Sequence, residues 1–376
     1  MSAPATIKQY DHFIPVSSTR LIAVLQQSGL ETTQLDVIDK LQAIISQQFN
    51  QRLSQLKLLY QPYNPDRELL MDEDPLMDGP GCIQALSEIL VAANYSELDQ
   101  QQIEYALQKT SPYGLEIHID FEAFAHVALF YRGKSQDQLE VRDWKRLYLK
   151  KKTISLMRYQ RLCLLLQYKN PEHKPGIHLK LFRDILRPDL EMLFPECRIR
   201  MKALDKIKLA VTGGGGTAGG LFATISKITA AVSPWTIIIA VAGFAMLLWR
   251  QISKILIQKT RYMATLAQNL YFHNLDNNAG AITYLIDLAR EEEIKEIILA
   301  YALLNLRDIR TREDLDTACE DWFAQQFGRR IDFDISDAVN KLRRFDVLSD
   351  VSGLQCRDAQ SINAQLDQRW LSFIRN

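Results

Sequence analysis

The feature that most restricts how this chain can fold is a stretch of 70 residues without one acidic residue, between Asp205 and Asp276. Within it lie two uncharged runs, 18 residues at 209–226 and 22 residues at 228–249, with Lys227 between them. A membrane-spanning helix needs about 20 predominantly apolar residues. The two runs therefore predict a helical hairpin in a membrane over residues 206–258, with its turn near 227–234.

The second run is the stronger candidate for a span. Ser233 and Pro234 are suited to beginning a helix, and Trp249 follows Trp235 by 14 residues, about 21 Å along a helix. This spacing would place one indole near each membrane interface. The basic residues expected at the interfaces are Lys208, Lys227, Arg250 and Lys254.

The first run is rich in glycine, which destabilises helices in water. In lipid, small residues spaced four apart let two helices approach closely. The residues expected to pack the hairpin are Gly213, Gly215, Gly216, Gly219, Gly220, Ala240 and Gly243.

Two other interpretations compete for this region. Gly214, Gly216 and Gly219 match the GxGxxG pattern of a dinucleotide-binding loop, but the acidic residue expected about 20 positions later is absent. The 16 residues from Pro234 to Trp249 are short for a full span, which leaves a buried hairpin in a soluble protein, or insertion into one leaflet, as alternatives.

The flanking regions predict mostly helices. Apolar residues recur at helical spacing over 16–27 and 35–59, and a capping-box pattern at Ser96 predicts a helix to about residue 109. Residues 116–121 alternate as a short strand would. A helix is expected over 282–301, with Glu291, Glu292, Glu293 and Glu296 on a solvated face.

Basic residues interleave with apolar ones between Arg142 and residue 169. Three interpretations stay open for this stretch: an element on an anionic membrane surface, a nucleic-acid patch, or the solvated face of an ordinary helix or strand pair.

The C-terminal residues follow the order of a winged-helix domain: helix to Gly328, strand at 331–335, helix to Phe345, hairpin around Gly353, last helix. The candidate recognition helix carries Lys341, Arg343 and Arg344 but lies among acidic residues. Nucleic-acid binding needs a net basic face, so we do not expect it here.

The 45 basic and 45 acidic residues cancel overall but are unevenly distributed. The net charge is −10 for residues 1–141 (9 basic, 19 acidic), +16 for 142–275 (23 and 7) and −6 for 276–376 (13 and 19). Because basic residues flank the hairpin on both sides, the positive-inside rule places both soluble parts on the cytoplasmic-type side.

The fold expected is mostly α, with helical soluble domains flanking a two-helix membrane hairpin. Five regions are predicted: an acidic N-terminal helical domain (1–141), a basic membrane-proximal region (142–205), the glycine-rich hairpin (206–258), a helical connector (259–310) and a winged-helix-like domain (311–376).

Sequence motifs of catalysis are missing from the chain. Its five cysteines form no CxxC pair, and HExxH, GxSxG, Walker and kinase motifs do not occur. His118, Asp120, Glu122 and His126 could together hold a metal, but a solvated strand face explains them better. No catalytic, cofactor-binding or metal-binding residue is assigned, and a non-enzymatic role is favoured over an enzymatic one.

Several stretches of the chain resemble the uncharacterised family typified by transmembrane protein 143, the domain of unknown function 3754. The positions that carry the resemblance are Tyr131, Arg132, Gly133, Asp189, Glu191, Pro195, Asn274, Asp276, Asn277, Asn278, Glu296 and Tyr301. The resemblance implies a membrane protein with an internal pair of spans and implies no activity.

The function expected is a non-enzymatic, membrane-anchored scaffold or regulator that docks an unknown protein partner at the cytoplasmic-type face. The bilayer and its anionic head groups are the other expected partners. An oligomeric pore or transport component built from the glycine-rich hairpin is the first alternative, and a membrane-bound hydrolase is the second.

Overall fold

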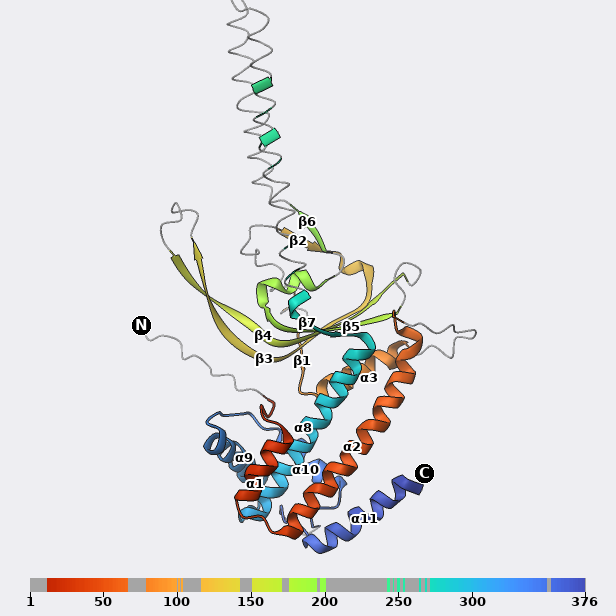
Figure 1. Ribbon diagram of the computed structural model, residues 1–376, viewed down its shortest axis with the longest axis vertical. Coiled ribbons are helices and arrows are strands. Elements are labelled where there is room, and N and C mark those ends of the chain that lie inside the picture. Colours follow the sequence, from red (N-terminus) through yellow and green to blue (C-terminus); the bar gives the residue numbers. More distant parts are fainter. Residues whose placement is uncertain are drawn as a thin grey trace, which may run out of the picture. The chain divides into compact units, whose positions relative to one another are not determined.

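The computed structural model contains helices in the majority, together with a sheet of five strands (Figure 1). It describes residues 12–66, 79–99, 101, 103, 116–142, 151–170, 176–194, 197–200, 242, 243, 246, 249, 250, 253, 264, 268, 271–349 and 353–375. The chain forms two compact units. The first comprises Met1–Leu98, Ala123–Asp184 and Leu275–Asn376, and the second comprises Asp99–Glu122 and Ile185–Asn274. Each unit is thus assembled from segments that are distant in sequence.

The N-terminal helices confirm the predicted periodicity. Helix α1 (Ser18–Gln27) begins where the Ser17 side chain accepts a hydrogen bond from the Arg20 amide. Helix α2 (Thr32–Tyr60) begins with a capping box, in which Glu31 and Gln34 each bind the other's backbone N–H. The short η1 (Gln61–Tyr63) and helix α3 (Gly79–Ala92) follow.

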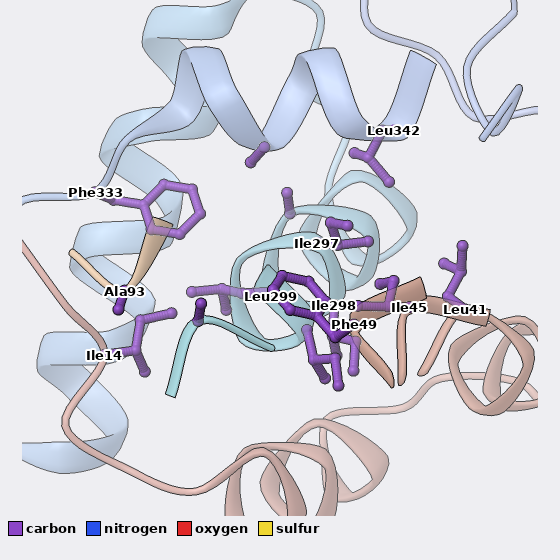
Figure 2. Packing of buried hydrophobic residues seen from close by; sticks show 14 of the residues in the cluster. Ile14, Leu41, Ile45, Phe49, Ala93, Ile297, Ile298, Leu299, Phe333 and Leu342 are labelled. Atoms are coloured by element: carbon purple, nitrogen blue, oxygen red, sulfur yellow. The ribbon is translucent and has the colours of Figure 1, made fainter. Parts of the chain in front are cut away.

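Helix α8 (Asn278–Leu306) is the centre of the first unit. It packs against α1, α2 and α3 and against two later helices, α9 (Arg312–Phe327) and α10 (Ile335–Arg344). Figure 2 shows Ile297 and Ile298 of α8 close to Ile45 and Phe49 of α2. All residues of α8 from Ile294 to Leu303 are buried. A helix that is buried on every side must be covered on every side. Helices α1, α2 and α3 from the N-terminal segment and α9 and α10 from the C-terminal segment cover α8.

The C-terminal elements follow the predicted order, with one correction. Helices α9 and α10 are followed by a single antiparallel bridge between Leu348 and Cys356 and by helix α11 (Ala359–Arg375), which packs on α2. The predicted strand at 331–335 is wrong, because only Ile331 makes a bridge and α10 already begins at Ile335. The Asp334 side chain caps that helix by accepting the Asp337 amide.

The five-stranded sheet of the first unit is the largest feature that the sequence did not predict. Its order is β1 (Ser96–Glu97), β3 (Phe124–Arg142), β4 (Lys151–Tyr168), β5 (Ile177–Leu186) and β7 (Asn274–Asn277). Strands β3 and β4 form a long antiparallel pair, in which Phe130 lies opposite Cys163 and Arg132 opposite Arg161. Residues Lys151–Tyr168 of the basic stretch are therefore strand β4, paired with β3.

The capping box predicted at Ser96 is also wrong. Ser96 and Glu97 pair with Tyr131 and Phe130 as strand β1. The Ile103 amide donates to the Asp99 carbonyl instead, so helical structure begins later than predicted. A two-residue strand has no periodicity of its own, and only its partner strand shows where it lies.

In the second unit, the predicted strand at 116–121 is confirmed as β2 (Glu116–Ile119), which pairs with β6 (Cys197–Arg200) in antiparallel register. The unit also contains η4 (Arg187–Leu193). Most of the predicted membrane hairpin lies outside the described residues, including Lys208, Gly213, Gly215, Gly216, Gly219, Gly220, Lys227, Trp235, Ala240 and Lys254. None of the helices in the described part of the chain is long and apolar enough to cross a membrane.

Candidate functional site

The acidic residues in the middle of α8 are the centre of a buried ionic network, which corrects the solvated face predicted for them. Glu292 is 1% exposed and Glu296 is 5% exposed. We call the network the α8 ion cluster. Its members are Glu291, Glu292, Glu293, Lys295 and Glu296 of α8, Arg132 of β3, and Lys341 and Arg344 of α10.

Glu292 joins three segments of the first unit. Its Oε1 accepts from Arg132 Nη2 at 2.5 Å and from Lys295 Nζ at 2.6 Å. Its Oε2 accepts the Ile14 amide at 3.2 Å. The Lys295 ammonium also donates to the Ile14 carbonyl at 2.5 Å. One carboxylate therefore holds the sheet, the central helix and the N-terminal segment together.

Burial changes the protonation energetics of this end of the cluster. It lowers the pKa of Lys295, and the neighbouring Glu292 carboxylate opposes that shift. For Lys295, the cost of burying its charge outweighs the favourable interaction with Glu292.

The other end of the cluster fixes α10 to α8. Glu296 accepts from Lys341 Nζ at 3.0 Å and from Asn94 Nδ2 at 3.1 Å. Lys341 lies 2.6 Å from Asp337, and Arg344 lies 2.8 Å from Glu293. Burial lowers the pKa of Lys341, but the carboxylates around it raise that pKa more strongly, above its ordinary value. Burial raises the pKa of Glu296, and Lys341 opposes that shift.

These contacts bear on the candidate recognition helix of the winged-helix-like region. Lys341, one of the three basic residues that this helix would offer to nucleic acid, is only 13% exposed at its side chain and pairs with three carboxylates. Arg344 is more exposed but also pairs with Glu293. Both cations therefore pair with carboxylates of the same chain.

A second buried arrangement lies where the chain enters α8. Asn278 has φ of +49°, a left-handed conformation that asparagine adopts more readily than most residues. Its side chain contacts Asp66, through Nδ2 at 2.5 Å, and the Leu179 amide, through Oδ1 at 3.2 Å. The Tyr60 hydroxyl donates to the Ile177 carbonyl at 2.6 Å beside it. These contacts connect the end of α2, strand β5 and the start of α8.

The resemblance positions on β3 have separate structural roles. Arg132 belongs to the α8 ion cluster and also places its guanidinium 4.0 Å from the centre of the Phe13 ring. The Tyr131 ring packs against the Tyr159 ring at 5.4 Å. Gly133 has φ of +76°, and a side chain there would also meet Gln160. Glycine is therefore required at this position by backbone geometry.

The remaining resemblance positions are spread over both units. Asn274, Asp276 and Asn277 form β7, and the Asp276 carboxylate accepts the Asn277 amide at 2.8 Å. Tyr301 is fully buried in α8. In the second unit, burial raises the pKa of Asp189, and His273 opposes the shift. The Glu191 side chain and Pro195 lie outside the described residues.

A few residues of the predicted second membrane helix are described. Ala242, Gly243, Met246, Trp249 and Arg250 are helical and exposed. The exposed fractions of Met246 and Trp249 are 74% and 72%.

Among the residues whose side chains are described, no group of three His, Cys, Asp or Glu could hold a metal ion, and the His118 side chain lies outside them. His126 is half-buried on β3, and burial lowers its pKa. The described cysteines, Cys82, Cys163, Cys319 and Cys356, are free thiols.

Residues 124–280 match the family described as "Protein of unknown function (DUF3754)". The chain contains a DUF3754 domain. The match begins at strand β3 and ends in the first turn of α8, so it includes Arg132 and Asn278 but not Glu296 or Tyr301. No solved structure matches the chain.

The DUF3754 domain therefore supplies one partner of the α8 ion cluster, Arg132, and the others lie outside it. Sequence reasoning misses the cluster because a run of three glutamates, Glu291–Glu293, is typical of a solvated helix face. A signal was present: the run Ile294–Leu303 has no polar face beyond Lys295 and Glu296, so charges embedded in it had to be buried and paired.

Acidic residues also gather beside α9, and they give a pH prediction. Burial raises the pKa of Asp316, and Asp332 and Asp334 raise it further. A raised pKa means that ionised Asp316 disfavours the folded state, so the destabilisation is present at pH 7 and vanishes as the pH falls below 3.8. We expect Asp316→Asn to raise the melting temperature at pH 7, with a gain that shrinks towards pH 4 in thermal unfolding scans. A gain that is constant with pH would contradict this origin.

Proposed function

We propose that this protein is a membrane-anchored scaffold, in which a helical hairpin between residues 206 and 258 holds the first unit at a cytoplasmic-type membrane face. The observation that carries the proposal is that both uncharged runs lie between two segments of the first unit. The chain leaves the first unit after Asp184 and returns at Leu275, and both uncharged runs lie in this excursion.

The two ends of the excursion lie in one sheet. Strand β5 precedes it, strand β7 follows it, and these two strands are neighbours in the five-stranded sheet. A pair of membrane helices brings the chain back to the side from which it started, so its two ends must be on one face of the bilayer. An insertion between neighbouring strands meets that requirement without rearranging the first unit.

Two further features support the anchor. Trp249 and Arg250 are exposed and helical at the end of the second uncharged run. This is the position at which an interfacial tryptophan and a basic residue facing anionic head groups are expected.

The α8 ion cluster supports the scaffold part of the proposal. Its charged groups are engaged with one another and with the backbone of residues 14 and 18. Such a network fixes helices, sheet and N-terminal segment relative to one another within the first unit. We propose that this rigid unit presents a docking surface to a protein partner.

Alkaline carbonate extraction of membranes from cells that express the full chain tests the anchor. We expect the protein to stay in the membrane pellet. Ile238→Lys places a charge near the centre of the second run, which costs about 2.5–3.5 kcal/mol on insertion scales, and should move much of the protein to the supernatant. The matched control is Leu58→Lys, at an exposed position of α2, which should remain in the pellet.

The same preparation tests the topology. Tags at the two ends of the chain should both be cleaved, or both be protected, when a protease is added to sealed vesicles. Release of the wild-type protein by carbonate, or protection of only one tag, would overturn the proposed anchor.

A further inference from the structure

The N-terminal segment of the first unit is bound as a peptide ligand would be. Residues 12–17, which we call the strap, form neither helix nor strand and precede α1. Pro15 disfavours helical backbone at Ile14 and favours an extended backbone at that residue. The strap is therefore held by specific contacts and not by a secondary structure of its own.

Hydrogen bonds hold the backbone of the strap, in addition to the contacts that its side chains make. Glu292 accepts the Ile14 N–H at 3.2 Å, and Lys295 donates to the Ile14 C=O at 2.5 Å. The two hydrogen-bonding groups of one residue are thus bound by an adjacent anion and cation. Charge-assisted hydrogen bonds of this kind are roughly twice as strong as neutral ones.

Side-chain contacts add selectivity. Ile14 is 2% exposed and belongs to the hydrophobic core of the first unit. The Phe13 ring lies 4.0 Å from the Arg132 guanidinium carbon, a cation–π contact. Arg132, Glu292 and Lys295, which we call the strap seat, therefore recognise an aromatic residue followed by an aliphatic one in extended conformation.

We propose that the strap seat is a peptide-binding site, occupied in cis by the strap, and that a partner protein docks by inserting an extended aromatic–isoleucine–proline segment in its place. The seat has the elements of peptide recognition: backbone hydrogen bonds supply affinity and side-chain contacts supply specificity. A partner segment of this composition can form every contact that Phe13 and Ile14 now form.

The strap competes with any such partner because it is tethered. A short tether gives the strap an effective concentration in the millimolar range. A weak ligand therefore cannot displace the strap from the seat, whereas a partner at high local concentration can. The inference deepens the docking part of the proposed function and does not depend on membrane insertion. Release by carbonate would leave it standing, and failure to bind peptide would leave the anchor standing.

The test uses the full chain and a fluorescent peptide with the sequence of residues 10–18. Phe13→Ala/Ile14→Ala in the protein weakens the strap while keeping the seat. We expect saturable binding of the peptide to this variant, with a Kd at least tenfold lower than for wild type. Thr19→Ala, at an exposed position of α1 just after the strap, is the matched control and should behave as wild type.

A peptide in which the phenylalanine and isoleucine are both alanine should not bind. Equal binding of the original peptide to wild type and to the weakened variant would overturn the proposal, and so would an absence of binding to a variant whose circular dichroism is that of wild type.

A second measurement does not depend on the folding of any variant. The same peptide with a photoreactive benzophenone in place of the phenylalanine is irradiated with wild-type protein. Mass spectrometry should locate the crosslinks in segments that contain Arg132 or Glu292, and excess unlabelled peptide should suppress them. Crosslinks elsewhere, or crosslinks that do not respond to competitor, would refute the site.

Discussion

Replacing Glu292 by alanine is expected to destabilise the first unit by about 3–5 kcal/mol, the cost of breaking a buried ion pair by removing one partner. The substitution leaves two cations, Arg132 and Lys295, without the carboxylate oxygen that they share. It also removes the acceptor of the Ile14 amide. Thermal unfolding in detergent should show a melting temperature lower by roughly 10 °C, at about 2–4 °C per kcal/mol.

Asp287→Ala is the matched control for this substitution. Asp287 lies on the same helix and forms an ion pair with Arg290, but its side chain is 55% exposed. Removing an exposed pair of this kind changes stability by less than about 1 kcal/mol. Equal effects of the two substitutions would show that the α8 ion cluster does not hold the first unit together.

A double-mutant cycle would measure the interaction energy between Arg132 and Glu292 apart from the other contacts of each side chain. Arg132→Met and Glu292→Ala are measured singly and together. Because the two side chains contact each other directly, we expect a coupling energy of about 0.5–3 kcal/mol. Additive effects would contradict the contact.

The second large effect is expected at Gly176, where alanine should destabilise the protein by about 2–5 kcal/mol. Gly176 has φ of +97°, and a Cβ there would overlap the Tyr63 carbonyl oxygen. The left-handed conformation costs a non-glycine residue about 1–2 kcal/mol. The clash adds about 1–3 kcal/mol, because a backbone atom must move to relieve it.

The matched control for Gly176 is Gly29→Ala. Gly29 has nearly the same φ, +103°, but no atom lies within 4 Å of the position that its Cβ would occupy. It should lose only the conformational part, about 1–2 kcal/mol. Urea unfolding of both variants, followed by circular dichroism, measures the difference. Equal losses would show that Tyr63 and Gly176 are not as close as the structure places them.

The position of Gly176 explains why the effect extends beyond one turn. It directly precedes β5, whose first residue, Ile177, accepts the Tyr60 hydroxyl hydrogen bond. Moving the Tyr63 backbone would disturb this bond and the contact of Asn278 with Asp66. The hydrogen bonds that connect α2, β5 and α8 at this site would then weaken together.

Local pattern was enough to predict several elements. Helices α1 and α2 follow from apolar spacing, strand β2 from alternation, and the order of α9, α10 and α11 from capping residues and turns. These elements were predictable because each carries its signal within its own residues.

The sheet and the ion cluster were not predictable in this way. Strand β1 is two residues long, and its pairing with β3 joins positions 96 and 131. Arg132 and Glu292 are 160 residues apart. No sequence pattern around either residue predicts that the two form a pair. The buried run Ile294–Leu303 could have shown that α8 is covered on all sides, but it could not show which segments cover it.

The sequence by itself determined where most helices of the first unit lie, which residues bracket the acid-free stretch, and how long its two uncharged runs are. These properties depend on neighbours along the chain. Only the tertiary structure decided that the N-terminal segment and the C-terminal helices enclose one central helix, because burial turns Glu292 and Glu296 from expected surface charges into the points where distant segments are joined. A charge inside a protein is stable only beside its partner, and folding brings the partners together.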